Sequence, residues 1–74
     1  MEQYKNLGGK SAIVAYEIGN DSITVQFRDG TTRLYNNQSA GAGSIEQMKS
    51  LAASGQGLNR FIGRVVKKGY VSKS

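Results

Sequence analysis

Hydrophobic and polar residues alternate with a period of two in the first half of the chain, and this alternation predicts strands. The clearest case is residues 22–28, where the apolar face carries Ile23, Val25 and Phe27. Residues 11–18 alternate in the same way, with an apolar face of Ala12, Val14, Tyr16 and Ile18. A third strand is expected from residue 31 to about residue 35. The three strands would form an antiparallel meander with one face left to cover.

The turns between these strands follow from local residue chemistry. Gly19-Asn20-Asp21 separates the first two strands, because Gly and Asn tolerate positive φ. Asp29-Gly30 separates the second and third strands and predicts a two-residue hairpin turn of the primed type, with Gly30 at positive φ.

Further along the chain the period lengthens to that of an amphipathic helix, and two helices are predicted. The first begins at Ser44, where Gln47 completes a capping box, and ends at Gly55-Gln56-Gly57. Its core-facing residues are Ile45, Met48, Leu51 and Ala52. The second covers about residues 58–68 and stops at Gly69. Its apolar stripe consists of Leu58, Phe61, Ile62, Val65 and Val66.

The element order β-β-β-α-α predicts an α+β fold, a three-stranded antiparallel meander with two helices packed on one face. With 74 residues, of which 38% are hydrophobic, the chain can build one small domain. Residues 11–70 are expected to form this domain, residues 1–10 a flexible N-terminal lead-in, and residues 71–74 a tail.

The residue types that are missing exclude several kinds of chemistry. The sequence contains no Cys and no His, which excludes zinc ribbons, thiolate nucleophiles and Ser-His-Asp triads. Its five acidic residues are scattered and show no metal-binding spacing. We therefore expect a protein that is not an enzyme, with no metal and no cofactor. No signal peptide and no membrane-spanning stretch is visible, so a cytoplasmic location without membrane contact is expected.

The charge of the chain is positive and unevenly placed. Ten Lys and Arg residues against five Asp and Glu residues give a net charge of +5. All acids lie in residues 1–46, whereas residues 47–74 carry only bases, namely Lys49, Arg60, Arg64, Lys67, Lys68 and Lys73. A one-sided basic segment attracts polyanions, although a solvated surface that keeps a small protein soluble has the same composition.

Within this segment, four bases recur at helical spacing opposite the apolar stripe of the second helix. They are Arg60, Arg64, Lys67 and Lys68, and they form the candidate site for nucleic acid or another polyanion. Gly57, Asn59 and Arg60 form a second candidate, an anion site at the start of the helix. The alternative for these three residues is a tight turn between helices. Tyr16 and Tyr35 are candidates for stacking on bases, or else for core packing.

Several of these residues together resemble the KTSC domain, a short module named after a C-terminal segment of some lysyl-tRNA synthetases. The resemblance spans residues 11–66 and rests on Ser11, Ile13, Tyr16, Ile23, Val25, Phe27, Gly30, Tyr35, Gly55, Leu58, Asn59 and Ile62. Arg33 replaces an aromatic residue of the family, the Val-Pro after the third strand is missing, and Tyr70 lies later than the family's closing Tyr. The resemblance implies a β-β-β-α-α module with no catalytic residues.

The sequence thus predicts a small binding module that contacts nucleic acid, RNA in preference to DNA, through the basic helical face. The alternative is a protein-interaction or oligomerisation module, with a protein partner or a homodimer and with incidental charge. Should the helical face not bind, the next candidates are Lys5, Lys10, Arg28 and Arg33.

Overall fold

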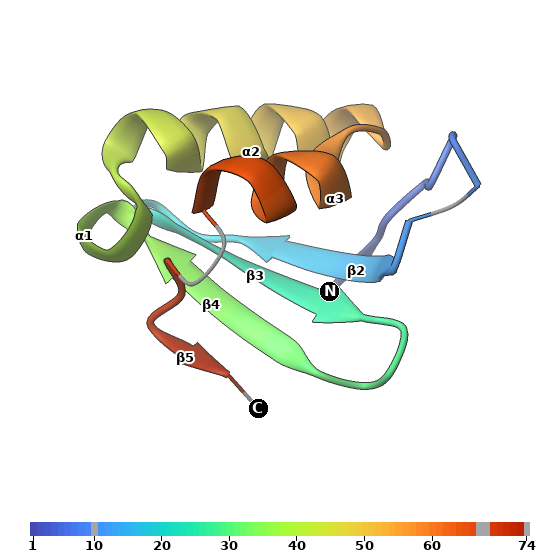
Figure 1. Ribbon diagram of the computed structural model, residues 1–74, viewed down its shortest axis with the longest axis horizontal. Helices are drawn as coiled ribbons and strands as arrows, with labels where there is room; N and C mark the ends of the chain where they lie inside the picture. The colour runs from blue at the N-terminus through green and yellow to red at the C-terminus, as the bar shows by residue number, and fades with distance from the viewer. Residues whose placement is uncertain (10, 67–68, 74) are drawn as a thin grey trace.

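An antiparallel sheet covered on one face by helices makes up the computed structural model, which describes residues 1–9, 11–66 and 69–73 (Figure 1). The strands lie in the order β1-β2-β3-β4-β5 and span Glu2–Gln3, Ile13–Ile18, Ser22–Phe27, Thr32–Asn36 and Ser72–Lys73. The predicted α+β class is confirmed, but the prediction of three strands is wrong. The predicted meander is β2-β3-β4, and short edge strands from the predicted lead-in and tail extend it on both sides.

A β-bulge in β2 changes which residues of this strand face the helices. Ile13 pairs with Phe27 and Ala15 pairs with Gln26, so Val14 is an extra residue without a partner on β3. Ile13 is 1% exposed and Val14 38% exposed. The predicted apolar face through Ala12 and Val14 is therefore wrong at this end of the strand, because the bulge reverses the alternation.

The β3–β4 hairpin turns through a three-residue loop and not through the predicted two-residue one. The N–H of Gly30 donates to the carbonyl of Phe27 (2.9 Å), and the N–H of Phe27 donates to the carbonyl of Thr31 (2.7 Å). Gly30 has the predicted positive φ, at 90°, but Asp29 does not, as a primed turn would require. Instead, Asp29 Oδ1 accepts from the N–H of Thr31 (2.9 Å) and holds the loop closed.

In the described residues, the helical segments after β4 are α1 (Asn37–Ala40), α2 (Ala42–Ser54), α3 (Leu58–Phe61) and the π-helix η1 (Ile62–Val66). Helix α1 is additional to the prediction, and the capping box belongs to it. Asn36 Oδ1 accepts from the N–H of Ser39 (2.8 Å) and Ser39 Oγ accepts from the N–H of Asn36 (3.0 Å). The predicted capping box at Ser44 is wrong, because α2 begins two residues earlier, after Gly41.

The turn between α2 and α3 contains two glycines in the left-handed conformation. Gly55 caps the C-terminus of α2 with φ at 82°, and Gly57 precedes α3 with φ at 84°. The predicted end of the first helix is confirmed. The turn brings α3 alongside α2 on the same face of the sheet (Figure 1).

The π-helix changes the buried stripe of the last helical segment. A π-helix has more residues per turn than an α-helix, so side chains four residues apart stay near one face of the segment, whereas side chains three apart do not. Leu58, Ile62 and Val66 are buried, whereas Val65 is 57% exposed and Phe61 is half-buried. The predicted stripe is therefore wrong at Val65 and incomplete at Phe61.

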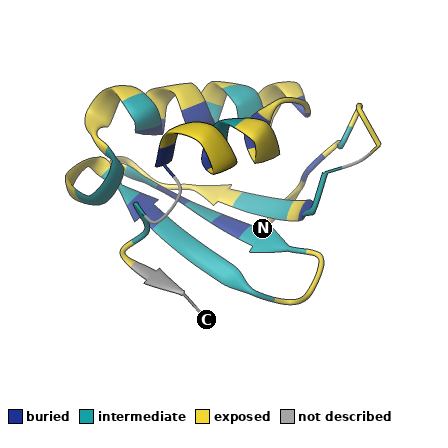
Figure 2. Ribbon diagram, viewed as in Figure 1, coloured by how far each residue is buried: buried dark blue, intermediate teal, exposed yellow. Residues whose placement is uncertain are grey.

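The core lies between the sheet and the helices (Figure 2). Its fully buried large side chains are Tyr35, Ile13, Ile23, Ile45, Met48, Leu58 and Val25. Tyr4 is also in the core at 3% exposure, so residues expected in a flexible lead-in pack as part of the domain. Within the described residues, no helix is long and apolar enough to cross a membrane.

Candidate nucleic-acid interface

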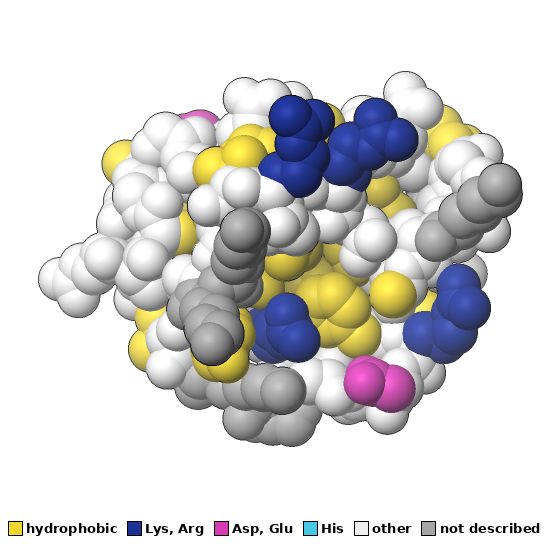
Figure 3. Space-filling model, viewed as in Figure 1, with side chains coloured by type: hydrophobic (Ala, Val, Ile, Leu, Met, Phe, Trp, Pro, Cys, Tyr) yellow, Lys and Arg dark blue, Asp and Glu magenta, His cyan; other side chains and the backbone are white. Residues whose placement is uncertain are grey.

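Arg60 and Arg64, the described members of the predicted basic face, lie on α3 and η1 with exposed side chains. The spacing of four places both on the outer side of a segment whose buried side carries Leu58 and Ile62. Lys67 and Lys68, the other two members, lie outside the described residues. In the view shared by Figures 1 and 3, Lys and Arg side chains surround an area of hydrophobic side chains between α3 and the β3–β4 hairpin.

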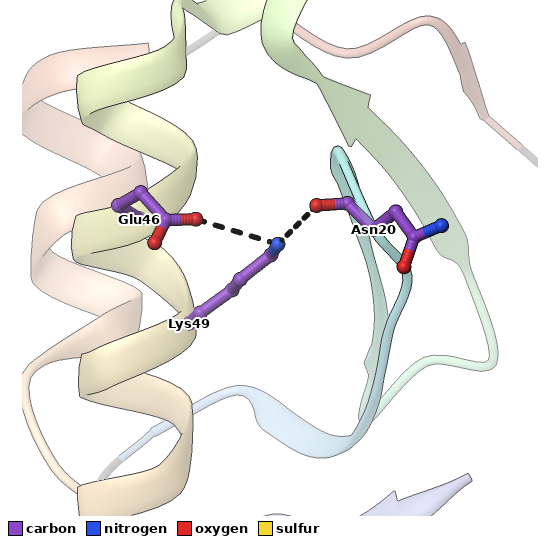
Figure 4. A network of polar contacts seen from close by, with 3 residues as sticks. All are labelled: Asn20, Glu46 and Lys49. Atoms are coloured by element: carbon purple, nitrogen blue, oxygen red, sulfur yellow. Dashed lines mark hydrogen bonds and ion pairs between the residues drawn. The ribbon is translucent and has the colours of Figure 1, made fainter.

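Neither arginine pairs with a carboxylate in the part of the chain that the structure describes. The ion pair found there joins Lys49 Nζ to Glu46 Oε2 at 3.4 Å on α2. Lys49 Nζ also donates to the backbone carbonyl of Asn20 at 2.8 Å and so ties α2 to the turn between β2 and β3 (Figure 4). Lys49 therefore has a structural role, and the positive charge of Arg60 and Arg64 stays available to a ligand.

The predicted anion site of Gly57, Asn59 and Arg60 lines one open groove of about 600 Å³. The opposite wall comes from the N-terminal segment and includes Tyr4. The N–H of Leu58, the first of α3, donates to the Tyr4 hydroxyl at 3.3 Å. The N–H of Leu58 is thus bonded within the protein and does not point free toward an anion. The α-helical segment α3 has only four residues, so its start does not make an anion site. Arg60 is the charged group that the groove retains.

A second groove of about 320 Å³ lies beside the first, and Arg60 lines both. Phe61 and Val65 provide apolar walls, and Arg64 provides a second guanidinium. The same surface of α3 and η1 therefore presents two cations next to exposed hydrophobic side chains.

Arg33 lies on the helix-facing side of the sheet, because its position pairs with Val25. Its guanidinium carbon is 4.8 Å from the centre of the Phe27 ring and 5.4 Å from that of Tyr70. Tyr70 in turn meets Tyr35 edge to face, with ring centres 6.2 Å apart. From the sequence, Arg33 is a departure from the family pattern and one of the next candidates for polyanion binding. Residues two apart in a strand face the same side of the sheet, so its position two residues before Tyr35 could have placed Arg33 on the side of Tyr35.

Two polar atoms of this cluster are buried without a hydrogen-bond partner in the described residues: Arg33 Nε and the Tyr35 hydroxyl. Burial raises the pKa of Tyr35, and the nearby positive guanidinium of Arg33 partly opposes this shift. The two groups are close, but they do not meet the geometry of a hydrogen bond.

The hairpin adds a third hollow, which we call the hairpin groove. It has a volume of about 380 Å³ and is lined by Ala12, Phe27, Arg28, Asp29, Thr31 and Arg33. Arg28 is fixed at one side, because its Nη2 donates to the carbonyl of Ser11 at 2.8 Å. Hydrogen bonds from Thr31 lower the pKa of Asp29, with a smaller contribution from the charge of Arg33, so its carboxylate is ionised at neutral pH.

The two tyrosines considered for base stacking differ in how far their rings are exposed. Tyr35 is completely buried, so it cannot present a ring face to a base, and the stacking interpretation is wrong for it. Tyr16 is half-buried and meets the Tyr4 ring edge to face, with ring centres 6.5 Å apart. Phe27, interpreted from sequence as a core residue, is only half-buried and lines the hairpin groove.

In the described residues, no three potential metal-ligating side chains come together. Comparison of the chain with protein-family models, with curated proteins and with solved structures finds no match. The resemblance to the KTSC domain accordingly rests on the sequence positions quoted above.

Proposed function

We propose that this chain is a small non-enzymatic binding module that contacts nucleic acid through Arg60 and Arg64. The observation that supports the proposal is the exposure of both guanidinium groups on one surface, without a carboxylate partner in the described residues. Lys67 and Lys68 are proposed to extend this surface along the chain. A preference for RNA over DNA is proposed from the resemblance to the KTSC domain.

Guanidinium groups suit this role because they bind phosphate oxygens through paired N–H donors. Contacts of this kind fix the position of the nucleic acid and carry little sequence information. Each neutralised phosphate releases counterions, so affinity falls as salt rises. For about three to four phosphates on a single strand, the slope of log affinity against log salt is about −2 to −3.

The test is fluorescence anisotropy with short labelled RNA and DNA oligonucleotides at several salt concentrations. The double variant Arg60→Gln with Arg64→Gln lowers the net charge from +5 to +3. Gln26→Glu with Gln47→Glu gives the same net charge and serves as the control. Gln26 belongs to the sheet face away from the helices, and Gln47 is exposed on α2. We expect the arginine variant to lose at least tenfold in affinity and the control to bind nearly as the wild type.

Absence of binding by the folded wild type at low salt would overturn the proposal, since electrostatic attraction is strongest there. Equal losses in the two double variants would show that only total charge matters and would remove the assigned surface.

The second candidate function, a protein-interaction or oligomerisation module, is favoured by the exposure of Val65 beside Phe61. Sedimentation that shows a dimer broken by Val65→Glu, with no binding to either oligonucleotide, would support it.

A further inference from the structure

We infer that the hairpin groove accepts one unpaired nucleobase, so that the module selects single-stranded over duplex nucleic acid. This inference rests on the proposed function and adds a base-binding subsite to the phosphate-binding surface of Arg60 and Arg64. The hairpin groove and that surface lie on the same side of the molecule, across the hydrophobic area in Figure 3.

The composition of the groove argues for a base and against a phosphate. Its walls offer hydrogen-bond donors from Arg33 and an ionised acceptor from Asp29, whereas Arg28 Nη2 donates to the carbonyl of Ser11. The carboxylate of Asp29 offsets the charge of one arginine at the groove, so a phosphate is attracted less strongly there than at Arg60 and Arg64, whereas the edge of a base presents donors and acceptors side by side. Arg60 and Arg64 have no such acidic neighbour in the described residues, so the phosphates belong there.

The apolar part of the groove suits a flat ligand. The guanidinium of Arg33 lies over the Phe27 ring and is held from a second direction by Tyr70. Bases pulled out of a helix stack on aromatic rings and on guanidinium planes of this kind. A base inside a duplex is already stacked and paired, so it cannot enter without the cost of unpairing.

The state of Arg33 without ligand also points to a binding role. Its charge has no carboxylate within ion-pair distance in the described residues, and its buried Nε makes no hydrogen bond there. A buried N–H donor without a hydrogen bond is unfavourable by itself, and the ring faces of Phe27 and Tyr70 beside the half-buried guanidinium compensate only in part. The packing of the two rings fixes the guanidinium before a ligand arrives, which lowers the entropy cost of binding.

The experiment compares three probes of similar charge: a single-stranded oligonucleotide, its duplex, and inorganic polyphosphate, which has no bases. Arg33→Lys keeps the positive charge and removes the planar group, and Phe27→Leu keeps an apolar side chain and removes the ring. Arg28→Lys makes the same chemical change at a groove residue that is not stacked on Phe27 or Tyr70, and it is the matched control. Circular dichroism and a thermal melt check the fold of each variant.

We expect the wild type to bind the single strand more tightly than the duplex or polyphosphate. Arg33→Lys and Phe27→Leu should each lose about five- to hundredfold for the single strand, the range of one stacked base. Their affinity for polyphosphate and their salt slope should stay unchanged, and Arg28→Lys should retain the preference. A 2-aminopurine base in the oligonucleotide should change its fluorescence on binding to the wild type, which reports stacking without any substitution.

Two outcomes separate the failure of this inference from that of the proposed function. If Arg33→Lys and Phe27→Leu bind the single strand as the wild type does, or if 2-aminopurine shows no change on binding, the base subsite is overturned and the phosphate surface stands. If the wild type binds none of the three probes at low salt, the proposed function fails, and the base subsite fails with it.

Discussion

The hydroxyl oxygen of Tyr4 accepts a hydrogen bond from the backbone N–H of Leu58 at 3.3 Å, and the two residues are 54 positions apart. Tyr4 is buried, and it joins the N-terminal segment to the start of α3. Tyr35 is the opposite case, a buried tyrosine whose hydroxyl has no partner in the described residues. The same substitution should therefore have opposite effects at the two positions.

Tyr4→Phe removes the acceptor and leaves the N–H of Leu58 without its partner, so we expect a loss of about 1–3 kcal/mol in the free energy of unfolding. Tyr35→Phe removes a hydroxyl that is buried at a cost, so it should be neutral or stabilising by up to about 1 kcal/mol. For a domain of this size, 1 kcal/mol corresponds to about 4–8 °C in Tm. Thermal melts of the two variants, side by side, measure the contrast. A Tm drop of equal size in both would contradict it.

The pH dependence of stability should also report on Tyr35. Burial raises its pKa above the ordinary value of 10.0. The folded protein therefore keeps the phenol neutral at a pH where the unfolded chain ionises it. This contribution is fully present below about pH 10 and is lost as pH rises toward the folded pKa. Urea unfolding between pH 8 and 11 should show a steeper alkaline loss for the wild type than for Tyr35→Phe, and parallel curves would count against the assignment.

The π-helix predicts which apolar residues of the last helical segment carry stability. Ile62→Ala should cost about 2–5 kcal/mol, because Ile62 is in the core. Val65→Ala should change stability by no more than about 0.5 kcal/mol, since its side chain is mostly exposed. Chemical denaturation measures the free energy of unfolding of the two variants. Similar losses of stability at both positions would indicate a regular α-helix in solution.

Three glycines should respond differently to alanine. Gly55 has positive φ, and an added Cβ would lie 2.6 Å from Cβ of Lys5, so Gly55→Ala combines backbone strain with a clash. Gly30 has positive φ but open space around it, and its alanine variant should lose only about 1–2 kcal/mol. Gly63 lies inside η1 with open space and no positive φ, so Gly63→Ala should stabilise by about 0.5–1 kcal/mol. Thermal melts should rank the three variants in this order, and a destabilised Gly63→Ala would refute the ranking.

The parts of the fold that sequence could predict are those where one period holds without interruption. The alternation of Ile23, Val25 and Phe27 placed β3 correctly. The bulge at Val14 was hidden, because Ile13 and Val14 are both apolar and either could face the core. The edge strands have two residues each, too few for any periodicity, and their pairing depends on contacts made only after folding.

The candidate site likewise has one part that the sequence could predict and one part that it could not. The exposure of Arg60 and Arg64 followed from the helical pattern, although the change to a π-helix moved Val65 to the surface. The stack of Arg33 on Phe27 and Tyr70 needs residues from the hairpin and from the C-terminal part of the chain. Such a cluster forms through tertiary packing, and no local spacing encodes it.

The sequential order of the strands has a consequence for how the chain folds. Neighbours β2, β3 and β4 are joined by short loops, so their pairing has a small loop-closure cost and should be formed in the folding transition state. The contact of Tyr4 with Leu58 closes a far longer loop and should form late. Stopped-flow kinetics should show that Val25→Ala slows folding, whereas Tyr4→Phe mainly speeds unfolding. The contact between Tyr4 and the start of α3 would then be among the last to form and the first to break.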